Sequence, residues 1–228
     1  MSQFRNEKIV CPSCYKKDNI KIYESIESTD IAARKRLLDG SLFTWRCPKC
    51  NYRTNTVFNL LYKNEERHFM IYLAADGDTI GMRNTMDNIE NDFNRLSPSK
   101  DIKYSMTRRI VLTSNELREK VMIFEAGLDD RIIEIMKCFY MSAVIENRSG
   151  MQIAECLFSV ENDQLMFEFL TMDGRFFSTP IRKELYEDFE REYNEYFGEE
   201  NDYFVNSDYA LDLYNRHEEE FEENDEED

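Results

Sequence analysis

The pattern of apolar and polar residues predicts short strands and amphipathic helices in the first half of the chain. A short helix is predicted at 31–39, and Gly40 can end it in a left-handed conformation. Residues 84–101 are predicted to form a polar helix and then a loop at 97–99, which is the best internal boundary. Strands are predicted where apolar residues alternate with polar ones or run together, at 19–23, 43–46, 56–62 and 68–73.

The second half predicts a strand, a helix pair, an antiparallel β-meander and a C-terminal helix. The strand is expected at 102–112, and Thr113 with Glu116 fits a capping box at the start of the first helix. Thr179-Pro180 is predicted to open the last helix, because proline suits the first helical position. The meander strands are expected at 154–160, 165–172 and 175–179. The seam between the paired helices is predicted at Leu117, Val121, Phe124, Ile132, Ile135, Met136 and Phe139.

Composition and charge exclude several classes of protein. Of the 228 residues, 42% are hydrophobic and 13% aromatic, so most of the chain should fold. The formal charge of −17 argues against general nucleic-acid or anionic-membrane binding by the whole surface. Residues 199–228 hold fourteen acids against one Arg, a net of −13, which leaves only −4 on the rest. No run approaches the roughly 18 apolar residues of a membrane span, and no signal segment is recognised, so a soluble cytoplasmic protein is expected.

Two Cys-Pro-Xaa-Cys pairs, Cys11 with Cys14 and Cys47 with Cys50, are the strongest chemical feature. Two residues between cysteines let one tight turn direct both sulfurs at one ion, while backbone amides donate to the thiolates. Two such turns suit one structural, tetrahedral zinc ion per chain. We therefore expect these four cysteines to be metal ligands in an N-terminal zinc ribbon, with the helix at 31–39 inserted between the pairs. An iron centre with the same ligands stays open, and a redox pair or simple buried cysteines are less favoured.

Further segments resemble a known family, the CpXC proteins of bacteria, over roughly residues 5–145. They surround and follow the cysteine pairs in the same order, at 37–42, 60–62, 108–111, 115–117, 119–121 and 127–131. The resemblance implies four cysteine ligands and a zinc site in a family without an established activity. Tyr15 and Asn51 stand where glycine often follows the second cysteine of each pair. Because Tyr tolerates a left-handed backbone poorly, the first turn can differ from the second.

Candidates for catalysis are few. The chain has only two histidines, His68 and His217, and no HExxH, GxSxG or Walker sequence. Four cysteines on one zinc would leave no position for an activated water. The acids around Arg131 (Asp129, Asp130 and Glu134) are interpreted as a helix start rather than a carboxylate site. Cys138 and Cys156 are interpreted as small buried hydrophobes. We therefore expect no enzymatic activity.

These patterns together predict an α+β protein with four regions. They are a zinc-ribbon region at 1–83, a helix and linker at 84–101, an α/β body at 102–198 and a largely disordered acidic tail at 199–228. The expected role is a non-enzymatic, zinc-stabilised module that binds a protein partner of unidentified kind. The alternative is a nucleic-acid-associated regulator that uses the basic and aromatic face of the ribbon.

Overall fold

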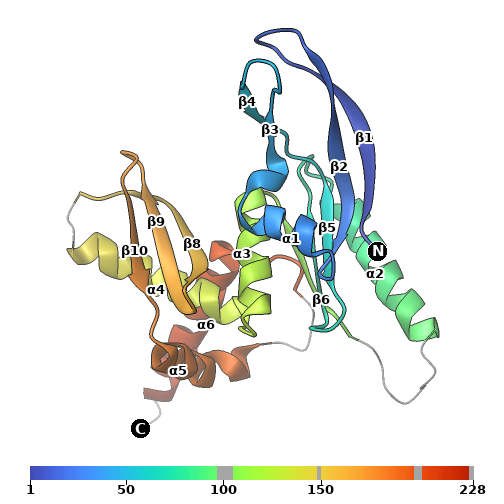
Figure 1. The fold of residues 1–228 in the computed structure, drawn as a ribbon. Coiled ribbons are helices and arrows are strands. Elements are labelled where there is room, and N and C mark those ends of the chain that lie inside the picture. The colour runs from blue at the N-terminus through green and yellow to red at the C-terminus, as the bar shows by residue number, and fades with distance from the viewer. Residues whose placement is uncertain (97–104, 148–149, 198–201, 226–228) are drawn as a thin grey trace. The chain divides into compact units, whose positions relative to one another are not determined.

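The computed structural model describes residues 1–96, 105–147, 150–197 and 202–225 (Figure 1). The chain divides into two compact units, Met1–Val121 and Met122–Asp228. This division differs from the expected regions, because the boundary falls inside helix α3 (Ser114–Glu125) rather than near 84–101. The loop expected at 97–99 lies outside the described residues.

The first unit is built on a five-stranded sheet with the order β1-β2-β5-β6-β7. Strands β1 and β2 are antiparallel, as are β5 and β6, whereas β2 with β5 and β6 with β7 are parallel. Strands β3 and β4 form a separate hairpin. Its elements are β1 (Gln3–Val10), β2 (Lys17–Glu27), α1 (Ile31–Leu38), the 3-10 helix η1 (Ser41–Phe43), β3 (Thr44–Arg46), β4 (Arg53–Asn55), β5 (Leu60–Asn64), β6 (Phe69–Leu73), α2 (Thr79–Leu96), β7 (Thr107–Val111) and the start of α3.

Parallel pairing explains how the first unit is connected. A parallel pair of strands needs a long crossover, and α2 lies in the connection between β6 and β7. Helix α1 and the β3–β4 hairpin lie in the connection between β2 and β5. The prediction that the strand within 102–112 belongs to a separate body is therefore wrong, because β7 pairs with β6 at the edge of the first sheet.

The turn between β5 and β6 also lies later than expected. The predicted strand at 56–62 begins only at Leu60, and the turn occupies 65–68. The buried side chain of Asn64 accepts a hydrogen bond from the N–H of Arg67 at 3.1 Å, which closes the turn. The strand that follows, β6, is buried at every position, as its unbroken apolar run requires.

The predicted end of α1 at Gly40 and the predicted start of α3 are confirmed. Gly40 has φ 76° after α1, and Gly127 has φ 76° after α3. The capping box at the start of α3 is formed in both directions. The N–H of Glu116 donates to Thr113 Oγ1 at 3.2 Å, and the N–H of Thr113 donates to Glu116 Oε2 at 2.9 Å.

The second unit contains the meander and three helices. Its three-stranded antiparallel sheet has the order β10-β9-β8. Its elements after α3 are α4 (Asp130–Asn147), β8 (Ile153–Glu161), β9 (Gln164–Thr171), β10 (Phe176–Pro180), α5 (Lys183–Tyr193), the 3-10 helix η2 (Asn194–Tyr196) and α6 (Ser207–Asp225). The predicted role of Pro180 is wrong, because it ends β10 and α5 begins at Lys183. An edge strand tolerates proline, since the missing N–H is not needed for pairing.

The predicted helix seam is right in part: Leu117 and Val121 of α3 and Ile132, Ile135 and Met136 of α4 are buried. Ile132, Ile135 and Met136 are buried with Phe158, Phe167 and Phe169 of the sheet in one apolar cluster. Phe139, however, is 53% exposed. In α3, Ile123 is fully buried in this cluster, whereas Phe124 is only half-buried. The buried positions of α3 also include Glu119 and Lys120, so they do not follow one stripe.

The segment at 199–228, expected to be largely disordered, contains helix α6. Ala210 and Leu213 are buried in the apolar cluster of the second unit, and α6 contacts α4. His217 is also buried. These three residues follow the spacing of one helical face. The charge count concealed this face, because the acids of the helix occupy other positions.

Candidate metal centre

Each cysteine pair forms the end of a β-hairpin. Cys11 to Cys14 join β1 to β2, and Cys47 to Cys50 join β3 to β4, at the top of Figure 1. We call residues 8–17 and 46–53 the cysteine tips. The Sγ atoms of Cys11 and Cys50 are 3.6 Å apart, as are those of Cys14 and Cys47. All four Sγ atoms lie within 4.8 Å of one another, so the predicted convergence of the cysteines is found.

The sulfur positions fit a tetrahedral metal ion. Metal–sulfur distances of about 2.3 Å give a tetrahedron with edges of about 3.8 Å, a length between the two separations of 3.6 Å and the 4.8 Å within which all four sulfurs lie. Cys11 and Cys47 are fully buried, Cys14 is half-buried and Cys50 is exposed. The donor set, four cysteine sulfurs, suits zinc and also iron.

The two tips share the same backbone structure. In each, the residue after the second cysteine has a left-handed backbone, with φ 57° at Tyr15 and φ 63° at Asn51. The expectation that the first turn could differ is therefore wrong. Matching hydrogen bonds of 2.8–3.0 Å hold both turns: Cys11 N to Lys16 O and Tyr15 N to Cys11 O, and Cys47 N to Tyr52 O and Asn51 N to Cys47 O. These bonds fix the left-handed position whatever side chain it carries.

Backbone N–H groups, burial and the crowded sulfurs together raise the pKa of one thiol, Cys14, and lower the pKa of two others, Cys47 and Cys50. The N–H of Tyr52 lowers the pKa of Cys50 to about 6, against the effect of burial. The N–H of Lys16 lowers the pKa of Cys14, but burial and hydrogen bonds with the other three sulfurs outweigh it and raise the pKa to about 12. Burial raises the pKa of Cys47, but backbone N–H groups and its sulfur neighbours outweigh that and lower it. Without a cation, four sulfurs this close retain protons among them; a divalent ion would replace these protons.

An apolar cluster and one polar contact join the two hairpins. Trp45 of β3 is buried with Cys11 and Cys47, and Ile9 and Ile20 of the first hairpin pack against them. The indole Nε1 of Trp45 donates to Asp18 Oδ2 at 3.1 Å. The cysteine cluster is thus tied to β2, and through β2 to the central sheet.

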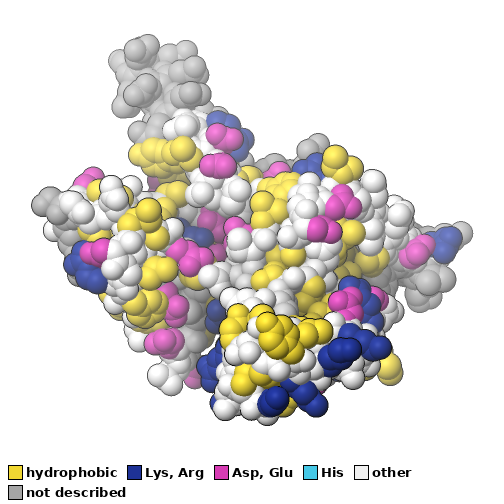
Figure 2. All heavy atoms as spheres, turned by 90° about the horizontal axis from the view of Figure 1, so that it is seen from above, with side chains coloured by type: hydrophobic (Ala, Val, Ile, Leu, Met, Phe, Trp, Pro, Cys, Tyr) yellow, Lys and Arg dark blue, Asp and Glu magenta, His cyan; other side chains and the backbone are white. Residues whose placement is uncertain are grey.

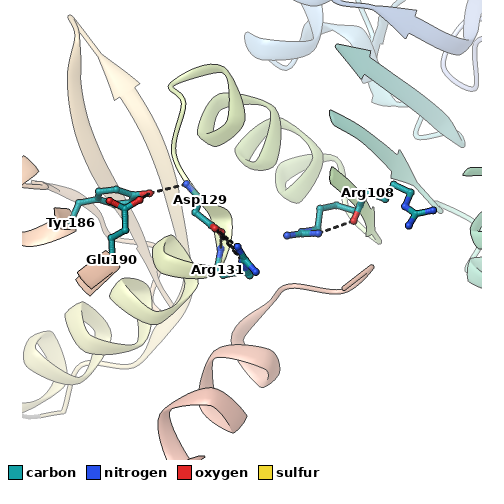
Figure 3. A network of polar contacts seen from close by, with 6 residues as sticks. Arg108, Asp129, Arg131, Tyr186 and Glu190 are labelled. Atoms are coloured by element: carbon teal, nitrogen blue, oxygen red, sulfur yellow. Dashed lines mark hydrogen bonds and ion pairs between the residues drawn. The ribbon is translucent and has the colours of Figure 1, made fainter. Parts of the chain in front are cut away.

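Local contacts hold several of the other candidate residues. Asp129 accepts from the N–H and the guanidinium of Arg131 at the start of α4, and the N–H of Asp129 donates to the Tyr186 hydroxyl at 2.9 Å (Figure 3). This confirms the interpretation of these acids as a helix start. His68 is exposed in the β5–β6 turn, whereas His217 stacks on Tyr193 with ring centroids 4.7 Å apart.

The interpretation of Cys156 as a buried hydrophobe is confirmed, and Cys138 is half-buried against the same cluster. Among the described residues, the four cysteines of the tips form the one group of three or more Cys, His, Asp or Glu side chains at metal-binding distance. Within the same residues, no helix combines the length and the apolar composition that a membrane span needs.

Comparison with known proteins agrees with the resemblance seen in the motifs. No curated protein and no solved structure gives a significant match to the chain. The model of the family described as CpXC protein matches residues 9–137. That range is more than half of the 228 residues and includes all four clustered cysteines. The chain belongs to the CpXC protein family.

Proposed function

We propose that Cys11, Cys14, Cys47 and Cys50 hold one structural zinc ion, which makes the two hairpins a zinc ribbon with α1 inserted between them. The observation that carries this proposal is the convergence of four Sγ atoms from two tips of equal backbone structure. Four thiolates fill the coordination sphere of a tetrahedral zinc and leave no position for a water or substrate. The role of the ion is then to hold the hairpins together.

The small size of the second hairpin supports a role for the ion in folding. Strands β3 and β4 pair over only three residues each, and an isolated two-stranded hairpin is marginally stable at best. Structural zinc sites supply about 10–16 kcal/mol of apparent binding free energy in zinc-finger peptides. Ion binding would therefore decide whether the tips keep their shape.

The chain acts, on this proposal, as a non-enzymatic module that binds a protein partner. Support comes from apolar side chains on the meander of the second unit. Leu170 and Phe176 lie opposite each other on β9 and β10 and are 39% and 65% exposed, and Met172 is 69% exposed. Aromatic and Met side chains are enriched in protein interfaces. The reducing cytoplasm is the proposed compartment, because it would keep the four thiols available as ligands.

The zinc proposal is tested by elemental analysis of protein purified without added metal. We expect about one zinc per chain. Cys47→Ser should lose the ion and unfold the tips, which the fluorescence of Trp45 reports, because this single tryptophan packs on Cys47. Cys156→Ser is the matched control, a buried cysteine outside the cluster that should leave the zinc content unchanged. Stoichiometric iron, or folding that is indifferent to a chelator, contradicts the proposal.

The partner proposal is tested by affinity capture with and without nuclease. A protein that survives nuclease and is lost with Phe176→Ser supports it. The control is Ile80→Ser, which replaces a residue of the first unit that is 75% exposed and should not change the capture. If both variants capture the same set of proteins, the exposed apolar side chains of the meander are not the partner-binding surface. Nucleic acid retained on washed protein, with no protein captured, favours the alternative role.

A further inference from the structure

Formal charge is divided unevenly between the two units. Residues 1–121 hold 21 Lys and Arg against 16 Asp and Glu, a net charge of +5. Residues 122–228 hold 8 against 30, a net charge of −22. The acidity that argues against polyanion binding by the whole surface therefore belongs to the second unit. The unit that carries the cysteine tips is cationic.

Within the first unit, the cysteine tips concentrate the positive charge. They contain no Asp or Glu, and their six cationic side chains are all exposed: Lys8, Lys16, Lys17, Arg46, Lys49 and Arg53. A zinc ion with four thiolates carries −2, so six cations leave a surplus of four positive charges. Seen from above in Figure 2, dark-blue Lys and Arg side chains lie beside the hydrophobic side chains of this end of the molecule.

Each tip also exposes a tyrosine ring. Tyr15 is 80% exposed and Tyr52 is 40% exposed. The left-handed backbone at Tyr15 costs roughly 1–2 kcal/mol for a residue with a Cβ, and glycine would avoid that cost. Because Tyr15 is 80% exposed, packing of its side chain within the chain offsets little of that cost. Strained residues of this kind are concentrated at binding sites.

A pocket beside the tips extends the cationic surface. Its volume is about 230 Å³, and Arg46 and Pro48 of the second tip are among its lining residues. Arg36 of α1, Lys21 of β2 and Asp18 also line it, so its charged lining residues are three cations and one acid. Arg36 and Arg46 are both exposed, so their guanidinium groups are open to an anion in this pocket.

We propose that the cysteine tips and this pocket bind single-stranded nucleic acid. Tyr15 and Tyr52 offer faces on which unpaired bases stack, and the tip cations with Arg36 contact the phosphates. The bases of a duplex are paired, so they would not stack on the two tyrosine rings. An acidic protein segment would contact the cations but not the rings. This inference rests on the proposed function in one respect, because the zinc ion holds the two tips side by side.

The test uses full-length protein with its zinc content measured, and labelled polyuridine RNA and polythymidine DNA of about 16 nucleotides. We expect binding at low salt that weakens steeply as salt rises. Tyr15→Ala should weaken it roughly 5- to 150-fold, the range for loss of one base-stacking contact, and Tyr15→Phe should restore it. Lys16→Gln with Lys17→Gln should weaken binding and lower the salt slope by about 0.7 per lost contact. Arg175→Gln with Lys183→Gln, both exposed in the second unit, is the matched control.

The outcomes separate this inference from the zinc proposal. Protein that lacks zinc as purified contradicts the zinc proposal, whatever it binds. Protein with one zinc that binds neither oligonucleotide at low salt overturns the nucleic-acid inference alone. The nucleic-acid inference is also overturned if polyglutamate competes as well as the oligonucleotides do and Tyr15→Ala has no effect on binding. That result would assign the surface to acidic protein segments. Tighter binding of one of the two oligonucleotides supports the inference and identifies RNA or DNA as the source.

Discussion

Helix α6 offers a sharp test of the second unit, because two leucines of the same helix differ in burial. Leu213 is fully buried in the apolar cluster, whereas Leu211 is 55% exposed. Truncation to alanine removes the same atoms at both positions and changes helix propensity equally. Any difference between Leu213→Ala and Leu211→Ala therefore measures how α6 packs in the second unit.

The expected magnitudes follow from this burial. Leu213→Ala loses the transfer free energy of a buried side chain, and the cavity that remains adds to the loss, about 2–5 kcal/mol in total. Leu211→Ala loses about half of the transfer free energy and leaves no enclosed cavity, which should cost below about 1 kcal/mol. For a chain of this length, 1 kcal/mol shifts Tm by roughly 2–4 °C. Leu213→Ala should thus lower Tm by several degrees more than its control.

The assay is urea unfolding followed by far-UV circular dichroism, which reports the helices of the chain, α6 among them. The fluorescence of Trp45 is recorded in parallel, because this single tryptophan follows the first unit. Equal losses for the two variants, or a Leu213→Ala loss within the error of the titration, would refute the packing of α6. Residues 199–228 would then be an acidic tail, as their charge alone suggests.

Three further predictions follow from burial and charge. Ile135→Ala should lower the free energy of unfolding by about 2–5 kcal/mol and Phe139→Ala by clearly less, because their exposed fractions are 2% and 53%. Equal losses of stability in urea titrations would contradict the assignment of the buried face of α4. Burial raises the pKa of Tyr186 to about 12, although the N–H of Asp129 lowers it. In the unfolded state the tyrosine pKa is about 10, so the unfolded state loses the Tyr186 proton first and stability should fall between about pH 10 and 12. Tyr186→Phe should show a smaller loss over this range in urea titrations at stepped pH, because burial also raises the pKa of Tyr72 and Tyr140 and their share of the loss stays. Residues 218–228 contain nine acids and one aromatic residue, and deleting them should leave Tm nearly unchanged and raise the affinity of the protein for polyanions at low salt. Equal affinities of the truncated and the full-length protein would exclude masking of the basic side chains by this segment.

The ligands of the candidate site were predictable because the spacing within each cysteine pair is local. Two residues between cysteines define each turn, and two turns of the same kind supply the four sulfurs that a tetrahedral ion takes. The backbone of Tyr15 was harder to predict. Its left-handed conformation follows from the turn's own hydrogen bonds, including Tyr15 N to Cys11 O at 2.9 Å. A propensity argument weighs the side chain at this position and omits those bonds.

The fold was less predictable wherever distant segments decide the outcome. Strand β7 follows α2 in the chain, and only parallel pairing with β6 assigns it to the first sheet. No local pattern distinguishes that pairing from the start of a new domain. In α6, the apolar face of Ala210 and Leu213 becomes visible only when spacing is considered before charge. The division of charge between the units required the boundary at Val121, which lies inside a helix.

The central claim is that the four tip cysteines hold one closed, structural zinc ion. X-ray absorption at the zinc edge, on protein purified without added metal, tests it most directly. The account predicts four sulfur neighbours at about 2.3 Å and no nitrogen or oxygen neighbour. A shell that includes an oxygen would mean an open, reactive position, and iron in place of zinc would mean a redox centre. Either result would contradict the account.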